Sequence, residues 1–114
     1  MKNNFNFKKP IIMGILNVTP DSFSDGGAYP STKSAVDRAL IMIEQGARII
    51  DIGGESTKPG SDRVSPIEQK RRIVDVISQL KKIIPDEIMI SVDTTSAEVA
   101  ETVIDLGVEM INDV

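Results

Sequence analysis

Four polar residues each end a short apolar run of this chain: Asn17, Asp51, Asp93 and Asn112. If the runs are parallel strands, their carboxyl ends meet at one mouth, which is where α/β proteins bind ligands. A carboxylate can accept two parallel N–H bonds from an amidine-like edge, and an amide beside it can both donate and accept. The four side chains therefore predict a pocket for a flat nitrogen heterocycle, which would reject analogues that leave its buried groups unpaired.

The same residues have a second interpretation, because Asp and Asn at strand ends often cap the next helix or begin a turn. That interpretation is weaker for Asp93, since Thr95 can supply the cap, and for Asn17, which lies well before the first expected helix. For Asp51 and Asn112 both interpretations stay open.

Two long segments rich in Ser, Gly, Asp and Pro follow the first two apolar runs. The first offers oxygen ligands that could hold Mg²⁺ together with a substrate phosphate: Asn17, Asp21, Ser22, Ser24 and Asp25. The second, GGESTKPGS, offers backbone N–H groups with Ser56, Thr57 and Lys58, a reasonable cradle for a diphosphate. Its glycines match neither nucleotide-binding fingerprint, and either segment could instead be a solvated connection.

Composition narrows the chemistry further. The chain has 114 residues, no cysteine, no histidine and a net charge of −4. Disulfides, thiolate nucleophiles, imidazole bases and Cys- or His-ligated metals are therefore excluded, and nucleic acid is an unexpected partner. No apolar run approaches the ~18 residues of a membrane span, and the first residues lack the apolar stretch of a signal peptide. We expect a cytoplasmic protein without membrane contact.

The elements that would position these residues alternate along the chain. Strands are expected over residues 11–16, 48–52, 88–92 and 108–111, each apolar on both faces and hence buried on both sides. Helices are expected over residues 31–46, 65–84 and 95–107, the last two beginning with the capping boxes Ser65–Glu68 and Thr95–Glu98. Their expected buried stripes are Val36, Ala39, Leu40, Ile43 and Ala47; Ile73, Ile77, Leu80 and Ile84; and Val99, Val103 and Leu106.

The order β-α-β-α-β-α-β predicts an α/β fold of parallel (β/α) units with right-handed crossovers. A weak repeat, GARIID and GVEMIN, supports this order. Since a complete (β/α)8 barrel needs ~250 residues, four strands and three helices correspond to the N-terminal half of a TIM-type barrel. We therefore expect residues 1–10 to form a tail and residues 11–114 a partial barrel without its C-terminal half. The alternative is a small open sheet that is complete in itself.

The segments IMGILNVTPDSFSDGG and GARIIDIGGESTKPGS resemble the two signature segments of the dihydropteroate synthase family. ISVDTTSAEVA and MINDV resemble the third and fourth strand ends of that family. The resemblance implies a pterin-binding TIM-type barrel. It also implies condensation of 6-hydroxymethyl-7,8-dihydropterin diphosphate with p-aminobenzoate to dihydropteroate and diphosphate. This is a transferase step of folate biosynthesis and the target of sulfonamides.

The resemblance also implies roles for individual residues. Asn17 would ligate the Mg²⁺ that bridges the diphosphate, Thr57 would contact that diphosphate, and Asp93 and Asn112 would bind the pterin ring. Asp51 would lie in the same pocket. The p-aminobenzoate pocket would be formed by Phe23, Asp25, Thr57 and Pro59. Lys58 stands where the family usually has Arg, so anion contacts there lose the planar guanidinium fork.

The expected mechanism needs no protein nucleophile. Cleavage of the pterin CH₂–O bond leaves positive charge on a ring-conjugated methylene, which nearby carboxylates would stabilise. We therefore expect Asp51, Asp93 and Asp25 to be catalytic. Ordered loops would exclude water, which competes with the aniline nitrogen.

In the family the second half of the barrel supplies further ligands for the pterin and diphosphate, and late helices supply the dimer contacts. A half barrel also exposes apolar strand surface and an unpaired edge, which favours association, as a homodimer or through that surface. Alternatives are a non-catalytic fragment that binds pterin weakly or not at all, and a separate chain that supplies the other half. A related pterin-binding methyltransferase is disfavoured because it would not be expected to carry NVTPDSFSDGG.

Overall fold

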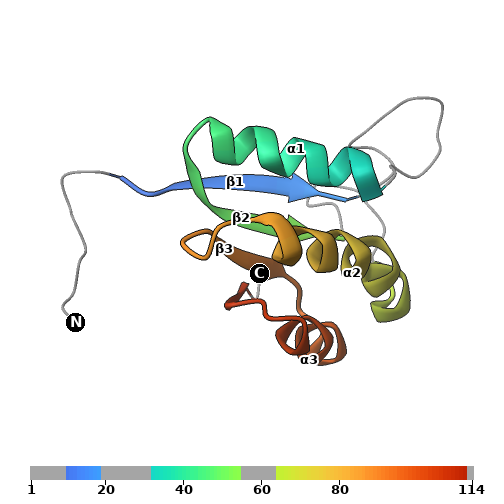
Figure 1. Cartoon of the computed structure of the whole chain (residues 1–114). Coiled ribbons are helices and arrows are strands. Elements are labelled where there is room, and N and C mark those ends of the chain that lie inside the picture. Colours follow the sequence, from blue (N-terminus) through green and yellow to red (C-terminus); the bar gives the residue numbers. More distant parts are fainter. Residues whose placement is uncertain (1–9, 19–31, 55–63, 113–114) are drawn as a thin grey trace.

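The computed structural model describes residues 10–18, 32–54 and 64–112 (Figure 1). The elements alternate as β1 (Ile12–Asn17), α1 (Thr32–Glu44), β2 (Ala47–Gly53), α2 (Pro66–Ile83), β3 (Met89–Asp93), α3 (Ala97–Asp105) and β4 (Met110–Asn112). This order confirms the predicted α/β class and the predicted succession of strands and helices.

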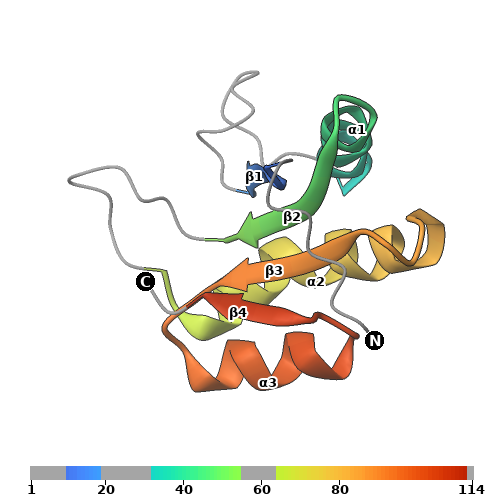
Figure 2. The same ribbon diagram turned by 90° about the vertical axis from the view of Figure 1, so that its left-hand side faces the viewer.

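The four strands form one parallel sheet in the order β1-β2-β3-β4. Each helix connects two neighbouring strands, and the three helices lie along one side of the sheet (Figure 2). The arrowheads of β2, β3 and β4 therefore end at the same side of the molecule, as expected for the carboxyl ends of parallel strands.

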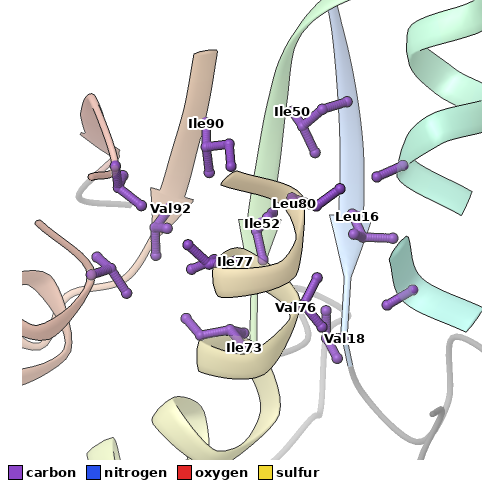
Figure 3. Close-up of a cluster of buried hydrophobic side chains, with 14 of the residues drawn as sticks. Leu16, Val18, Ile50, Ile52, Ile73, Val76, Ile77, Leu80, Ile90 and Val92 are labelled. Carbon is purple, nitrogen blue, oxygen red and sulfur yellow. The ribbon is translucent and has the colours of Figure 1, made fainter. Parts of the chain in front are cut away.

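The hydrophobic core fills the layer between the sheet and the helices. From α2, Ile73, Ile77 and Leu80 point toward the strands (Figure 3). They meet side chains on the helix side of the sheet: Leu16, Ile50, Ile52, Ile90 and Val92. Each fully buried side chain of this size contributes about 1.5–3 kcal/mol to folding, so this layer holds the strand ends in place.

The opposite face of the sheet, called the open face below, is exposed along β1, which corrects the prediction that this strand is buried on both sides. Ile15 is 60% exposed and Met13 is 41% exposed, whereas Leu16, which follows Ile15 and faces the helices, is 1% exposed. The reason is that all three helices of the described residues pack on the other face. In β1, alternation therefore separates the buried Leu16 from the exposed Ile15, whereas Asp51 of β2 and Ser91 of β3 are buried although they lie on the face without helices.

Two local predictions need correction. The N-cap of α3 is Ser96, whose side chain accepts a hydrogen bond from the Val99 N–H, and not Thr95. Leu40 is 37% exposed, while Ala35 takes its place in the buried stripe of α1. The predicted cap at Ser65 is confirmed, with Pro66 in the first turn and the Glu68 N–H donating to the Ser65 hydroxyl.

The strands end one residue later than predicted, and they begin one or two residues later except β2, which begins one residue earlier. Asn17, Asp93 and Asn112 are the last residues of their strands, and Asp51 lies inside β2. The candidate side chains are therefore held by the hydrogen-bond ladder of the sheet. None of the described helices is both long and apolar enough to cross a membrane.

Candidate functional site

The register of the sheet brings the predicted strand-end residues into one row. Asn17 is aligned with Gly53, Gly53 with Asp93, and Asp93 with Asn112. Two residues earlier in their strands, Asp51 is aligned with Ser91. Because alternate residues of a strand share a face, both rows point to the open face of the sheet. The predicted meeting of these side chains at one mouth is therefore supported by the pairing of the strands.

Asp51 is the centre of the hydrogen bonds at this mouth. Its Oδ1 accepts a short hydrogen bond from the Ser91 hydroxyl and a second from Asn112 Nδ2 at 2.9 Å. Asp51 is only 4% exposed and Ser91 is fully buried. Two donors on one oxygen offset the cost of burying the carboxylate, and they tie β2 to both β3 and β4.

Asp93 lies beside this group and is only partly buried. Burial of its carboxyl and the neighbouring Asp51 carboxylate raise the pKa of Asp93 to about 6, while the Asn112 amide opposes the rise. A carboxyl that takes up a proton near neutral pH can act as an acceptor or a donor toward a bound ring. Strongly perturbed carboxyls of this kind are typical of ligand sites.

Ser91 is a site residue that the sequence patterns did not single out. The available signal was its position two residues before Asp93 in the same strand, which places it on the same face. It was missed because a serine in an apolar strand has no distinctive pattern of its own. Its partner Asp51 is 40 residues away in the chain and becomes its neighbour only through strand pairing.

The remaining predicted site residues lie outside the described part of the chain. These are Asp25, Phe23, Thr57, Lys58 and Pro59, together with the other loop residues Asp21, Ser22, Ser24 and Ser56. Their proposed contacts with diphosphate and p-aminobenzoate therefore stay predictions.

Of the oxygen ligands predicted for Mg²⁺, only Asn17 lies in the described part of the chain. Among the described residues, no cluster of three acidic side chains could hold a metal ion. Asn17 stands at the end of β1, in the row of Asp93, and offers one neutral amide oxygen. Since Mg²⁺ in phosphate-handling sites keeps several waters and takes few protein ligands, Asn17 fits as a single ligand beside substrate phosphate.

Comparison with known proteins decides the family. The sequence pattern of the family described as "Pterin binding enzyme" matches residues 13–114, which include the whole mouth of the sheet. The chain belongs to the pterin-binding enzyme family. The resemblance on which the family was predicted is thereby confirmed.

Individual relatives of this chain agree with that placement. Dihydropteroate synthase of Staphylococcus haemolyticus is 54% identical over 105 residues, which are 92% of this chain and 38% of that protein. The crystal structure of dihydropteroate synthase from Clostridium difficile with pteroic acid has a TM-score of 0.86 at 53% identity. The enzyme from Xanthomonas albilineans with 4-aminobenzoic acid has a TM-score of 0.85 at 44% identity. The chain covers 94% and 96% of its own length in these two matches, and 40% of each solved chain.

The chain thus spans about two fifths of the length of these relatives. Its four parallel strands and three helices have the (β/α) arrangement of a TIM-type barrel, as predicted. All four strand-end residues lie inside the matched part of the chain.

Proposed function

We propose that this protein takes part in dihydropteroate synthesis, in which 6-hydroxymethyl-7,8-dihydropterin diphosphate condenses with p-aminobenzoate. The observation that carries the proposal is the group formed by Asp51, Ser91, Asp93 and Asn112 at the carboxyl ends of three adjacent strands. Its polar groups suit a pterin ring, and relatives of the same family have been solved with pteroic acid and with 4-aminobenzoic acid.

Asp93 and Asn112 are the groups that would bind the ring. The Asp93 carboxylate can accept the amino and ring N–H groups of the pterin edge, and the Asn112 amide can bind the adjacent acceptor. Asp51, held from β3 and β4, adds negative charge beside the methylene that becomes positive as the CH₂–O bond breaks. The leaving group is the diphosphate, and the aniline nitrogen forms the new C–N bond.

Asn17 would hold Mg²⁺ through its amide oxygen. When bound, the ion would neutralise charge on the diphosphate. Thr57 and Lys58 are proposed as diphosphate contacts, and Phe23, Asp25 and Pro59 as parts of the p-aminobenzoate pocket, on the resemblance alone. A sulfonamide would compete with p-aminobenzoate for that pocket. A cytoplasmic location also stays a prediction from the sequence.

Replacing the proposed ring-binding carboxylate tests this function. Asp93→Asn should raise the Kd for pteroic acid at least about tenfold, because an amide cannot accept both N–H groups of the ring edge. The matched control is Asp75→Asn, which makes the same change at an exposed position of α2. Calorimetric titration of both variants measures the effect. Equal affinities for Asp93→Asn and the unsubstituted chain would contradict the proposal.

The alternative is a pterin-binding role without catalysis, favoured by the share of its relatives that the chain spans, which is 38–40%. An assay for dihydropteroate formation separates the two functions. Turnover by the 114-residue chain would exclude the non-catalytic function. Binding of pteroic acid without turnover would favour it.

A further inference from the structure

The first two turns of α2 make hydrogen bonds to the ends of the strands that carry the site. Arg72 Nη1 donates to the carbonyl of Gly54, the residue that follows β2, at 2.6 Å. The Thr94 hydroxyl donates to Gln69 Oε1 at 2.9 Å, and Thr94 follows Asp93 at the end of β3. One helical turn therefore holds the ends of two strands through polar contacts.

Thr94 extends the connection to β4. Its backbone N–H donates to the carbonyl of Asn112 at 3.0 Å, and its hydroxyl accepts from the Ser96 N–H at 3.0 Å. A single residue thus joins α2, the end of β3, the end of β4 and the cap of α3. Asp93 and Asn112 are the proposed ring-binding residues, and Thr94 contacts or adjoins both.

The side chains that make the contact between α2 and the end of β3 are buried. Gln69 and Thr94 are each 4% exposed, and Gln69 Nε2 donates to the carbonyl of Val64 at 2.9 Å. An apolar residue would fill this site on a buried helix stripe without a desolvation cost. The Gln69 amide instead has hydrogen-bond partners on both its oxygen and its nitrogen. A buried network of this kind favours one arrangement of the elements that it joins.

The fit at the end of β2 is equally close. A Cβ atom on Gly54 would lie 3.1 Å from the backbone oxygen of Gln69 and 3.2 Å from its Cα. A side chain at this position would therefore press on the backbone of α2, and glycine lets the chain after β2 lie close against the helix without such a shift. Arg72 is itself held by Glu68 through Nε at 3.0 Å, and its side chain is 11% exposed.

We propose that Gln69 and Arg72 are positioning residues, which hold the ends of β2, β3 and β4 at the spacing that joins Asp51, Asp93 and Asn112 into one site. The consequence for ligand binding rests on the proposed function. Ladder hydrogen bonds fix the register along each strand, and the last of them between β3 and β4 is the bond from the Thr94 N–H to the Asn112 carbonyl, so contacts from α2 hold the residues beyond that point. Displacement of a binding group by about 1 Å costs up to about 100-fold in an enzyme, so a fixed spacing matters here.

The test removes the buried hydrogen bond between Thr94 and Gln69 and then measures two properties of the proposed site. Thr94→Val and Gln69→Met each abolish it, and Gln69→Met is apolar, flexible and of similar length, so it suits the buried position. Thr102→Val is the matched control, since the Thr102 hydroxyl bonds only to the Glu98 carbonyl one turn earlier in α3. Thr94→Ser keeps the hydroxyl and should behave like the unsubstituted chain.

Two measurements are made on each folded variant: the pKa of the Asp93 carboxyl by NMR titration, and the Kd for pteroic acid. In Thr94→Val and Gln69→Met we expect the pKa of Asp93 to fall by about half a unit or more, as the carboxyl moves from Asp51 toward water. The Kd should rise about tenfold. Thr102→Val and Thr94→Ser should change neither quantity.

The outcomes separate this proposal from the proposed function. The positioning role is wrong if Thr94→Val and Gln69→Met both keep the Asp93 pKa and the Kd of the unsubstituted chain. It is also wrong if Thr102→Val shifts these two quantities by as much as Thr94→Val and Gln69→Met do. If the unsubstituted chain does not bind pteroic acid but the buried variants still shift the Asp93 pKa, the positioning role stands and the proposed function fails. A Thr94→Val chain that does not fold leaves Gln69→Met to decide.

Discussion

At the scale of single residues, two neighbouring carboxyls of the site have unequal surroundings. Asp51 Oδ1 already accepts hydrogen bonds from Ser91 and Asn112, whereas Asp93 is only partly buried at the mouth. Burial and the neighbouring Asp51 carboxylate raise the pKa of Asp93. The difference in surroundings follows from position, because Asp51 lies inside β2 and Asp93 is the last residue of β3.

The raised pKa of Asp93 predicts a pH-dependent stability. The folded protein binds this proton with a pKa of about 6, against an ordinary value of 3.8. The stabilisation is therefore fully present below the ordinary pKa and is lost as the pH rises through about 6. Between about pH 4 and about pH 7, Asp93→Asn should gain stability relative to the unsubstituted chain by about 1 kcal/mol, a value reduced for solvent screening.

Urea unfolding at several pH values measures this difference. Glu109 contributes with the opposite sign. Burial alone would raise its pKa, but hydrogen bonds from the Ile90 N–H and Lys81 outweigh burial and lower it. Because Glu109 is present in both proteins, its effect cancels in the comparison. A stability difference that does not change with pH would contradict the assigned pKa of Asp93.

At the scale of elements, α2 is the helix that connects the core to the site. Its stripe of Ile73, Ile77 and Leu80 packs on the strands, and its first two turns bond to the residues after β2 and β3. The helix begins where Ser65 caps it and Pro66 fixes its first turn, both readable from the chain. Local sequence signals therefore determine where the helix begins. Packing of its apolar stripe against the sheet then positions the strand ends.

Truncation of that stripe should be costly. Ile77→Ala removes a side chain that is fully buried between α2 and the sheet, and we expect a loss of about 2–5 kcal/mol in the free energy of unfolding. Ile83→Ala is the control, since Ile83 lies at the end of the same helix and is 54% exposed. Chemical denaturation of both variants measures the effect, and equal losses at the two positions would show that the stripe does not form this core.

At the scale of the whole molecule, the sheet has one covered and one open face. The open face carries Ile15, which is 60% exposed, and Met13, which is 41% exposed. The same face carries the polar group at the strand ends. Apolar surface next to a polar mouth favours association, as the sequence already predicted for a half barrel.

Self-association of the 114-residue chain should therefore depend on the open face. Ile15→Lys should lower the average mass measured by analytical ultracentrifugation at high concentration, because a charge there opposes burial of the sheet. Ile104→Lys makes the same change on α3, at a residue that is 54% exposed, and should leave the average mass unchanged. A monomeric unsubstituted chain at all concentrations would exclude this association.

The sequence by itself determined the order of the elements, the family and the strand-end residues of the site. These follow from local signals: apolar runs, Ser65 with Pro66, glycine stops and two long signature segments, each contained within a few neighbouring residues. Leu40 and the cap of α3 were misplaced because a periodic pattern does not fix the rotation of a helix or the first residue of its cap.

Only the tertiary structure decided which side chains meet. Ser91 bonds to Asp51 across 40 residues of chain, Asn112 bonds to Asp51 across 61, and Thr94 bonds to Gln69 across 25. The open face of the sheet was decided in the same way, since all three described helices pack on one side. The physical reason is common to these cases: parallel pairing and helix packing set the distances between residues remote in sequence, and no local pattern carries those distances.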